Sequence, residues 1–320
     1  TVVSDEPGVR HTYKKFANHW DETTGHVDEI EMIVLNDSTA RTAALQSGQV
    51  DIINSVEPKI ADLLCRAPNL NVVSTAGAGH YVFIMHVDTA PFDNKDLRLA
   101  LKYAINRQDL VDKILRGYGS VGNDFPINAA YPLFDESIPQ REFDLEKAAE
   151  HYKKSGHDGS PIILRTADGA FPGAVDAAAL FQQTAQAAGI PLEIKREPND
   201  GYWSEVWNAQ PFCASYWGGR PVQDQMYTTA YLSTADWNDT RFKNPEFDAK
   251  LLEARGELDG AKRKAMYTEM AYMVRDEGGL ILPMFNNFIE ATSSNVGGYT
   301  GSPIGETMHG FAAARCWKTA

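Results

Sequence analysis

The sequence contains few cysteines, and their spacing gives no sign of a metal site or a disulfide framework. Cys65, Cys213 and Cys316 lie far apart in a chain of 320 residues. No pair has the CxxC spacing of a zinc site, and three cysteines are too few to hold a small disulfide scaffold together. One disulfide with one free thiol stays open in an oxidising compartment, but buried or unused thiols are the better interpretation. We expect no metal and no cofactor.

Long apolar segments and an excess of basic residues are also missing. Apolar runs such as residues 81–85 are far shorter than the about 20 residues that span a bilayer as a helix. Lys and Arg number 30 against 43 Asp and Glu, which gives a net charge of −13. This charge repels phosphate backbones, and basic residues cluster only on short surfaces such as residues 262–264. We expect no membrane span and no binding of nucleic acid.

The common catalytic motifs are absent: there is no GxxxxGK[ST] loop, no HExxH and no GxSxG. His80 and His86 flank an apolar strand and would share one face, as a metal pair does. Without a third ligand, one packed and one hydrogen-bonded histidine is the simpler interpretation. A hydrolase using Asp124, Asp224 and His86 stays an alternative, although no spacing rule links them. We therefore expect a protein that is not an enzyme.

What the chain does have, at residues 91–126, is a pair of helical patterns that ends in a glycine loop. Asn106 has the character of an N-cap for the second helix, and Asp109 suits the first turn by its charge. Gly117 should end that helix in a left-handed conformation. The apolar face of the first helix is predicted to contain Leu97, Ala100, Leu101, Ala104 and Ile105.

Strand and helix patterns alternate on both sides of this stretch. Residues 30–53 have the order strand, helix, strand, which favours a parallel strand pair with a right-handed crossover. Residues 162–194 repeat the same order. Two such blocks predict an α/β fold with two lobes and mixed sheets. We place lobe I at residues 1–87 and 286–320, and lobe II at residues 88–285.

Several segments together resemble the bacterial extracellular solute-binding proteins that serve peptide-type ABC transporters. The first is PFDNKDLRLALKYAINRQDLV, followed by the glycines of the GYG exit. The others, in the order of that family, are residues 44–51, 217–219, 237–238 and 244–248. The resemblance implies a periplasmic-binding-protein-like fold whose lobes close on a ligand. It also implies that this chain corresponds to the C-terminal portion, with the N-terminal part of lobe I missing.

Two short stretches are candidates for the ligand site. At residues 216–221, Trp217 could cover a ligand and Arg220 could bind its charge, while Gly218 and Gly219 would let the backbone turn sharply. Many peptide-binding relatives place at this turn an aspartate that holds the ligand ammonium, and Arg220 with Gly219 stands there instead. The resemblance therefore suggests a carboxylate contact. Core packing of Trp217 and a salt bridge of Arg220 are equally good alternatives.

The second candidate stretch is the end of the glycine loop. Its glycines would let the backbone and one short polar side chain approach a ligand. Asp124 would then supply the missing negative anchor, although capping a turn is the commoner role of such an aspartate. The complete predicted ligand site contains Trp217, Gly218, Gly219, Arg220, Asp124, Asn123 and His86.

The sequence thus predicts the substrate-binding component of an ABC importer. The resemblance implies that it captures a peptide or a small peptide-like, amino-acid-derived solute and delivers it to a permease in the inner membrane. We expect a periplasmic monomer. The alternatives are a cryptic hydrolase of peptide-like substrates, or a binder of sugar, nickel or haem on the same fold.

Overall fold

The computed structural model describes residues 1–319, and the chain divides into two compact units. Unit 1 is Thr1–Gly77 with the C-terminal segment from Asn287, and unit 2 is Ala78–Asn286. The chain passes between them inside two long strands, β5 (Leu70–Met85) and β10 (Leu280–Ser293). The first division falls within β5 rather than after residue 87. The reason is that residues 80–85 already pair with a strand of unit 2.

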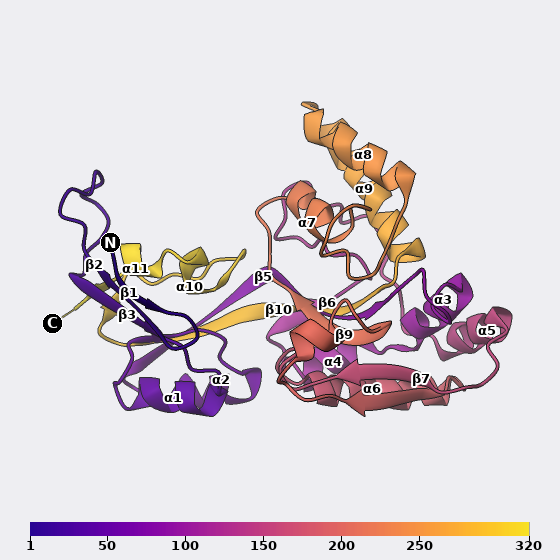
Figure 1. Ribbon diagram of the computed structural model, residues 1–320, viewed down its shortest axis with the longest axis horizontal. Coiled ribbons are helices and arrows are strands. Elements are labelled where there is room, and N and C mark those ends of the chain that lie inside the picture. Colours follow the sequence, from indigo (N-terminus) through magenta and orange to yellow (C-terminus); the bar gives the residue numbers. More distant parts are fainter. Residues whose placement is uncertain (320) are drawn as a thin grey trace. The chain divides into compact units, whose positions relative to one another are not determined.

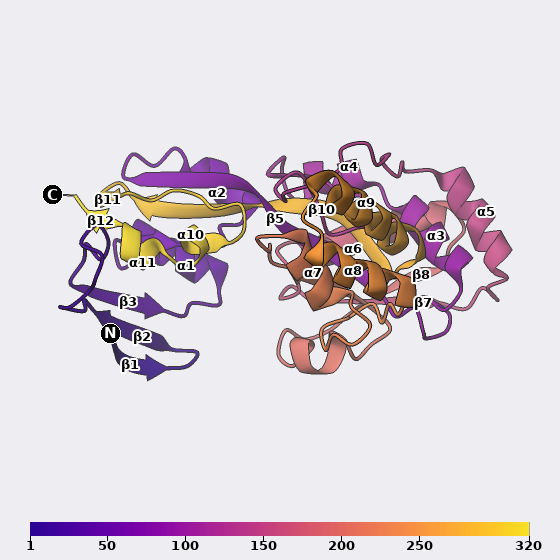
Figure 2. The same cartoon turned by 90° about the horizontal axis from the view of Figure 1, so that it is seen from above.

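Unit 1 holds a three-stranded antiparallel sheet and the ends of the two long strands. Figure 1 shows its helices and strands, and Figure 2 shows them from above. Its further elements are β1 (Val2–Glu6), β2 (Arg10–Lys14), β3 (Glu29–Ile33), α1 (Ser38–Gln46), β4 (Ile52–Ile53), α2 (Pro58–Leu64), β11 (Val296–Gly297), α10 (Glu306–His309), α11 (Ala312–Arg315) and β12 (Trp317–Lys318).

The parallel pair predicted for residues 30–53 is wrong. Strand β3 pairs antiparallel with β2, and β4 pairs antiparallel with β10, so α1 joins two different sheets. The periodicity identified the elements correctly, but a strand's partner depends on contacts with distant segments that no local pattern contains.

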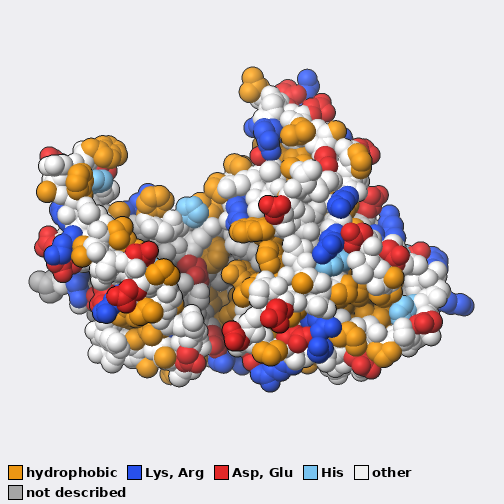
Figure 3. All heavy atoms as spheres, in the orientation of Figure 1, with side chains coloured by type: hydrophobic (Ala, Val, Ile, Leu, Met, Phe, Trp, Pro, Cys, Tyr) orange, Lys and Arg blue, Asp and Glu red, His pale blue; other side chains and the backbone are white. Residues whose placement is uncertain are grey.

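The loop between β2 and β3 exposes large apolar side chains. Phe16 is 54% exposed and Trp20 is 88% exposed. In Figure 3 hydrophobic side chains lie at the surface of this loop. Both rings therefore contribute little to the core of unit 1.

Unit 2 is built on a mixed sheet with helices around it. Its strands follow the order β10, β5, β9, β7, β8, and β6 pairs with β10. In Figures 1 and 2, α3 lies beside α5 and α8 beside α9. The elements are α3 (Lys95–Ala104), α4 (Arg107–Lys113), β6 (Gly119–Val121), α5 (Leu145–Ser155), β7 (Ile162–Thr166), α6 (Ala174–Ala187), β8 (Leu192–Arg196), the π-helical turn η1 (Tyr202–Val206), β9 (Phe212–Trp217), α7 (Gln223–Ala230), α8 (Pro245–Gly256) and α9 (Gly260–Glu277).

Two predictions about this unit are confirmed. The strands of residues 162–194, β7 and β8, are parallel neighbours joined by α6. The side chain of Asn106 accepts a hydrogen bond from the backbone N–H of Asp109 at 3.2 Å, so it caps α4 as expected. Gly117 has the predicted left-handed φ of 81°, but it lies in the loop, because α4 already ends at Lys113.

The glycine loop packs against β10. A Cβ atom on Gly122 would lie 2.2 Å from the backbone oxygen of Leu282, and one on Gly119 would lie 2.4 Å from the backbone oxygen of Phe285. These glycines are therefore needed for the close approach of two backbones. The prediction that they open the loop to a ligand is wrong. Among residues 1–319, no helix is long and apolar enough to cross a membrane.

Candidate ligand-binding site

The C-terminal end of β9 carries the main candidate residues. Antiparallel pairing with β5 places Trp217 opposite His80 and leaves the following turn at the edge of the paired segment. Trp217 is only 5% exposed, and its indole Nε1 donates to Asp239 Oδ2 at 3.1 Å. Core packing thus accounts for most of the Trp217 surface.

Arg220 is the cation of this turn, and it is half-buried. Its Nη1 donates to the backbone oxygens of Gly218 at 3.1 Å and Gly219 at 3.0 Å, and its backbone N–H donates to the Tyr131 hydroxyl at 3.3 Å. No aspartate or glutamate of unit 2 lies within salt-bridge distance of this guanidinium. Within this unit the Arg220 guanidinium therefore has no carboxylate partner.

His80 lies close to this cation. Its side chain is fully buried, and Nδ1 is 3.0 Å from the backbone oxygen of Ala78. Burial, aided by the charge of Arg220, lowers the pKa of His80 to about 4. The imidazole is therefore neutral at pH 7 and does not add to the positive charge at the turn.

The two glycines of the turn do not have the role that the sequence suggested. Neither Gly218 nor Gly219 has a positive φ. A Cβ on Gly218 would meet Arg220 Nη1 at 3.7 Å, which is ordinary van der Waals contact. Their backbone oxygens are instead the acceptors that hold the Arg220 side chain folded over its own turn.

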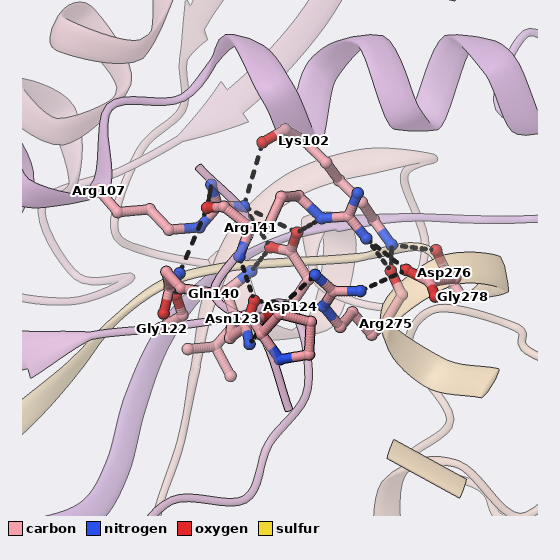
Figure 4. A network of polar contacts seen from close by, with 12 residues as sticks. Lys102, Arg107, Gly122, Asn123, Asp124, Gln140, Arg141, Arg275, Asp276 and Gly278 are labelled. Carbon is pink, nitrogen blue, oxygen red and sulfur yellow. Dashed lines mark hydrogen bonds and ion pairs between the residues drawn. The ribbon is translucent and has the colours of Figure 1, made fainter. Parts of the chain in front are cut away.

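Asp124 is not available to a ligand, which contradicts its predicted role as an ammonium anchor. Its side chain is fully buried, and Figure 4 shows it among cationic side chains. Arg107 Nη2 donates to Oδ2 at 2.7 Å, and Arg141 Nε lies 2.9 Å from the same oxygen. The backbone N–H of Leu282 donates to Oδ1 at 3.0 Å. The carboxylate therefore joins the glycine loop to α4 and β10.

The other members of this network are also structural. Lys102 Nζ donates to the backbone oxygens of Arg275 and Gly278, each at 2.8 Å. The Asn123 side chain donates to the backbone oxygen of Pro139 at 3.0 Å and accepts from the Arg141 N–H at 2.8 Å, as Figure 4 shows in part. The Asn123 side chain thus joins residues 139–141, and its predicted role in the ligand site has no support in this geometry.

His86, the last predicted site residue, is buried at 2% exposure in different surroundings from His80. Burial, with the charge of Arg241, lowers the pKa of His86 to about 4. Asp224 binds Arg255 and Asp124 binds Arg107, so the two carboxylates of the hydrolase alternative have different partners. Within residues 1–319 no group of three or more His, Cys, Asp or Glu could hold a metal ion.

Two residues that contribute to the site were not identified from the sequence. Tyr131 is buried and reaches the turn through its hydroxyl, although it comes from a proline-rich loop. Asp239 lies under Trp217, and burial raises its pKa to about 7. In the sequence, Asp239 was marked only by its position directly after the Trp237-Asn238 pair. That position does not reveal its contact with Trp217, which lies 22 residues earlier.

A comparison with known families matches residues 1–239 to the bacterial extracellular solute-binding proteins, family 5 middle region. The glutathione-binding protein GsiB of Salmonella choleraesuis is 26% identical over 300 residues, which covers 89% of this chain and 58% of that protein. Heme-binding protein A of Haemophilus influenzae is 24% identical over 310 residues, covering 92% and 55%.

Among solved structures, the periplasmic binding protein DppA of Helicobacter pylori in complex with the peptide STSA has a TM-score of 0.86 and 17% identity. The likeness covers 99% of this chain and 62% of that one. At this identity it shows the fold alone. The chain spans little more than half the length of the curated relatives named above.

Proposed function

The chain belongs to the bacterial extracellular solute-binding proteins of family 5, and from this premise we propose that it captures a peptide or a small peptide-like, amino-acid-derived solute for an ABC importer. Its two compact units would act as the lobes that close on the solute. Solute contacts on both lobes would shift the population toward the closed form, which docks on the permease in the inner membrane. We place the protein in the periplasm, as a monomer without a cofactor.

The observation that carries this proposal is the guanidinium of Arg220 at the end of β9. It has no carboxylate partner within unit 2 and makes hydrogen bonds only to backbone oxygens of its own turn. Arginine donates two parallel hydrogen bonds to a carboxylate, which every peptide and amino-acid derivative with a free C-terminus presents. The relatives named for glutathione, dipeptides and a bound Met-Leu agree with such a solute.

The alternatives have less support. Haem and nickel appear in the names of relatives or neighbours, but no feature of the turn favours either, or a sugar, over a carboxylate. A hydrolase would need Asp124, Asp224 and His86 to share a substrate, but Asp124 pairs with Arg107 and Asp224 with Arg255. Turnover of model peptides would be the sign of that activity.

Native mass spectrometry of the purified protein, followed by calorimetric titration with glutathione and Met-Leu, tests the proposal. We expect a retained solute mass or measurable binding of one of these probes. Arg220→Ala should weaken that binding by about 2–5 kcal/mol, or roughly 30-fold to several-thousand-fold, because it leaves the solute carboxylate unpaired. Arg220→Lys should restore only part of the affinity.

Arg196→Ala is the matched control, because Arg196 pairs with Asp168 on the exposed surface of the same unit. It should leave the affinity unchanged. Equal affinities of Arg220→Ala and the wild type would show that the Arg220 charge does not contact the solute. The absence of both a retained mass and any binding would contradict solute capture by this chain.

A further inference from the structure

The segment of unit 2 that connects β6 to α5 forms a loop whose two ends are joined. Gln140 Nε2 donates to the backbone oxygen of Gly122 at 2.8 Å, and the Asn123 side chain accepts from the Arg141 N–H at 2.8 Å. Arg141 Nε lies 2.9 Å from Asp124 Oδ2 in the buried ion network. Figure 4 shows these residues together. A segment closed in this way is an Ω-loop, and we use this name for the chain from Asp124 to Arg141.

The Ω-loop packs like part of the core, although it contains no helix or strand. Phe125, Ile127 and Tyr131 are each only 3% exposed. Asp135 attaches a later part of the loop to α9, because Thr268 Oγ1 donates to Asp135 Oδ2 at 2.8 Å. The loop is therefore fixed at its ends and along its length, and it can act as a support for whatever contacts it.

What the Ω-loop contacts is the turn that carries Arg220. The Tyr131 hydroxyl accepts a hydrogen bond from the Arg220 backbone N–H at 3.3 Å. Burial raises the pKa of Tyr131 to about 12, so this hydroxyl is neutral at pH 7. Gln223, the buried first residue of α7, donates through Nε2 to the backbone oxygen of Pro132 at 2.8 Å. Two consecutive loop residues thus hold the chain on both sides of residues 221–222.

The position of the Arg220 guanidinium depends on this turn. The hydrogen bonds of its side chain within residues 1–319 go to the backbone oxygens of Gly218 and Gly219, which belong to the same turn. A displacement of the turn therefore moves the positive charge with it. An arginine binds a carboxylate through two parallel hydrogen bonds, so a small displacement of the guanidinium weakens both.

From these contacts we infer that Tyr131 and Gln223 are positioning residues, which hold the Arg220 turn in place before a solute carboxylate binds. A turn that is already ordered loses less conformational entropy on binding. The inference deepens the proposed function and rests on it for the role of Arg220. It also gives the buried ion network a second role, because Asp124 and Arg141 close the loop that carries Tyr131.

Tyr131→Phe tests the support with little disturbance, because it keeps the buried ring and removes only the hydroxyl. Residue-resolved hydrogen exchange by NMR follows the Arg220 amide directly and needs no solute. We expect its exchange to become about 2- to 12-fold faster, the range of one hydrogen bond between neutral groups. Tyr152→Phe is the matched control, because the Tyr152 hydroxyl contacts His157 instead, and it should leave the Arg220 amide unchanged.

Met-Leu and its C-terminal amide distinguish positioning of Arg220 from general damage to the fold. By calorimetry, Tyr131→Phe should bind Met-Leu about 2- to 12-fold more weakly than the wild type does. Binding of the amide, which offers no carboxylate to Arg220, should stay the same. In an Arg220→Ala background, Tyr131→Phe should have no further effect on Met-Leu. Gln223→Met, which keeps the length of the side chain but loses the donor to Pro132, should weaken Met-Leu binding with the same selectivity.

Unchanged exchange of the Arg220 amide in Tyr131→Phe would overturn the inference. An equal loss of affinity for Met-Leu and for its amide would also overturn it, as would an equal loss in the presence and absence of the Arg220 side chain. The hydroxyl would then act on the fold in general. Failure of the proposed function has a different pattern: the wild type would bind neither peptide, while faster exchange in Tyr131→Phe would still support the contact between loop and turn.

Discussion

Replacing Asp124 by asparagine should strongly destabilise unit 2, because this residue is the buried anion of a cationic network. Its side chain is fully buried, and the side chains of Arg107 and Arg141 are only 4% and 2% exposed. Lys102 is also buried and is attracted to the same carboxylate when it carries its proton. The substitution keeps the size of the side chain but leaves the two guanidinium groups with only Asp276, which is 40% exposed, as a counter-charge.

Removing one partner of a buried ion pair costs about 3–5 kcal/mol, because the remaining charge stays buried without compensation. With an m value of about 3 kcal/mol/M in urea, this loss lowers the unfolding midpoint by about 1–1.7 M. Tryptophan fluorescence is the assay, since four of the six tryptophans lie in unit 2 and report its unfolding.

Asp109→Asn is the matched control for this experiment. Asp109 pairs with Lys113 four residues later on the exposed surface of α4, and such pairs contribute less than about 1 kcal/mol. The same substitution in the same unit should therefore shift the midpoint far less. If both variants lose the same stability, the reasoning that burial makes the Asp124 pair costly to break is refuted.

The pH dependence gives a second check on the same residue. Burial alone would raise the pKa of Asp124, but Arg107 and Arg141 hold the pKa below its usual value. The stabilising contribution of Asp124 is therefore present above the unfolded pKa near 4 and is lost as the pH falls through the folded value. The difference between wild type and Asp124→Asn should therefore shrink as the pH falls below the unfolded pKa near 4.

Two further stability predictions follow from unit 2. Gly122→Ala should lower the free energy of unfolding by about 1–3 kcal/mol, because its Cβ would lie 2.2 Å from the Leu282 oxygen. Gly260→Ala, which has open space around it in α9, should be neutral or stabilising, and equal urea midpoints of the two variants would contradict the prediction. Burial lowers the pKa of Lys102 to about 7, so the folded state binds its proton less tightly than the unfolded chain does. Wild-type stability should rise relative to Lys102→Met as the pH increases from about 7 toward 10, and parallel pH profiles of the two proteins would refute the claim.

The local elements of this protein could be predicted from its sequence, because the signals that specify them lie within a few residues of one another. The Asn106 cap and the apolar face of α3 needed only helical periodicity and a side chain that binds a backbone N–H. The parallel pair of β7 and β8 followed from the strand–helix–strand order, although the same order at residues 30–53 did not give a parallel pair. The turn at Arg220 was recognised because residues 217–219 resemble the family. Arg220 was noticed because the aspartate of many relatives is missing from this turn.

The tertiary structure alone decided which of these polar groups remain available to a solute. Asp124 and Arg220 are both single charges beside glycines in the sequence, and either could have faced a solute. Long-range contacts distinguish them, since Asp124 meets Arg107, Arg141 and β10, whereas Arg220 meets no carboxylate in unit 2. Asp239 reaches Trp207 and Trp217 only because the chain returns beneath β9, and such a contact between residues more than 20 positions apart leaves no trace in a local pattern.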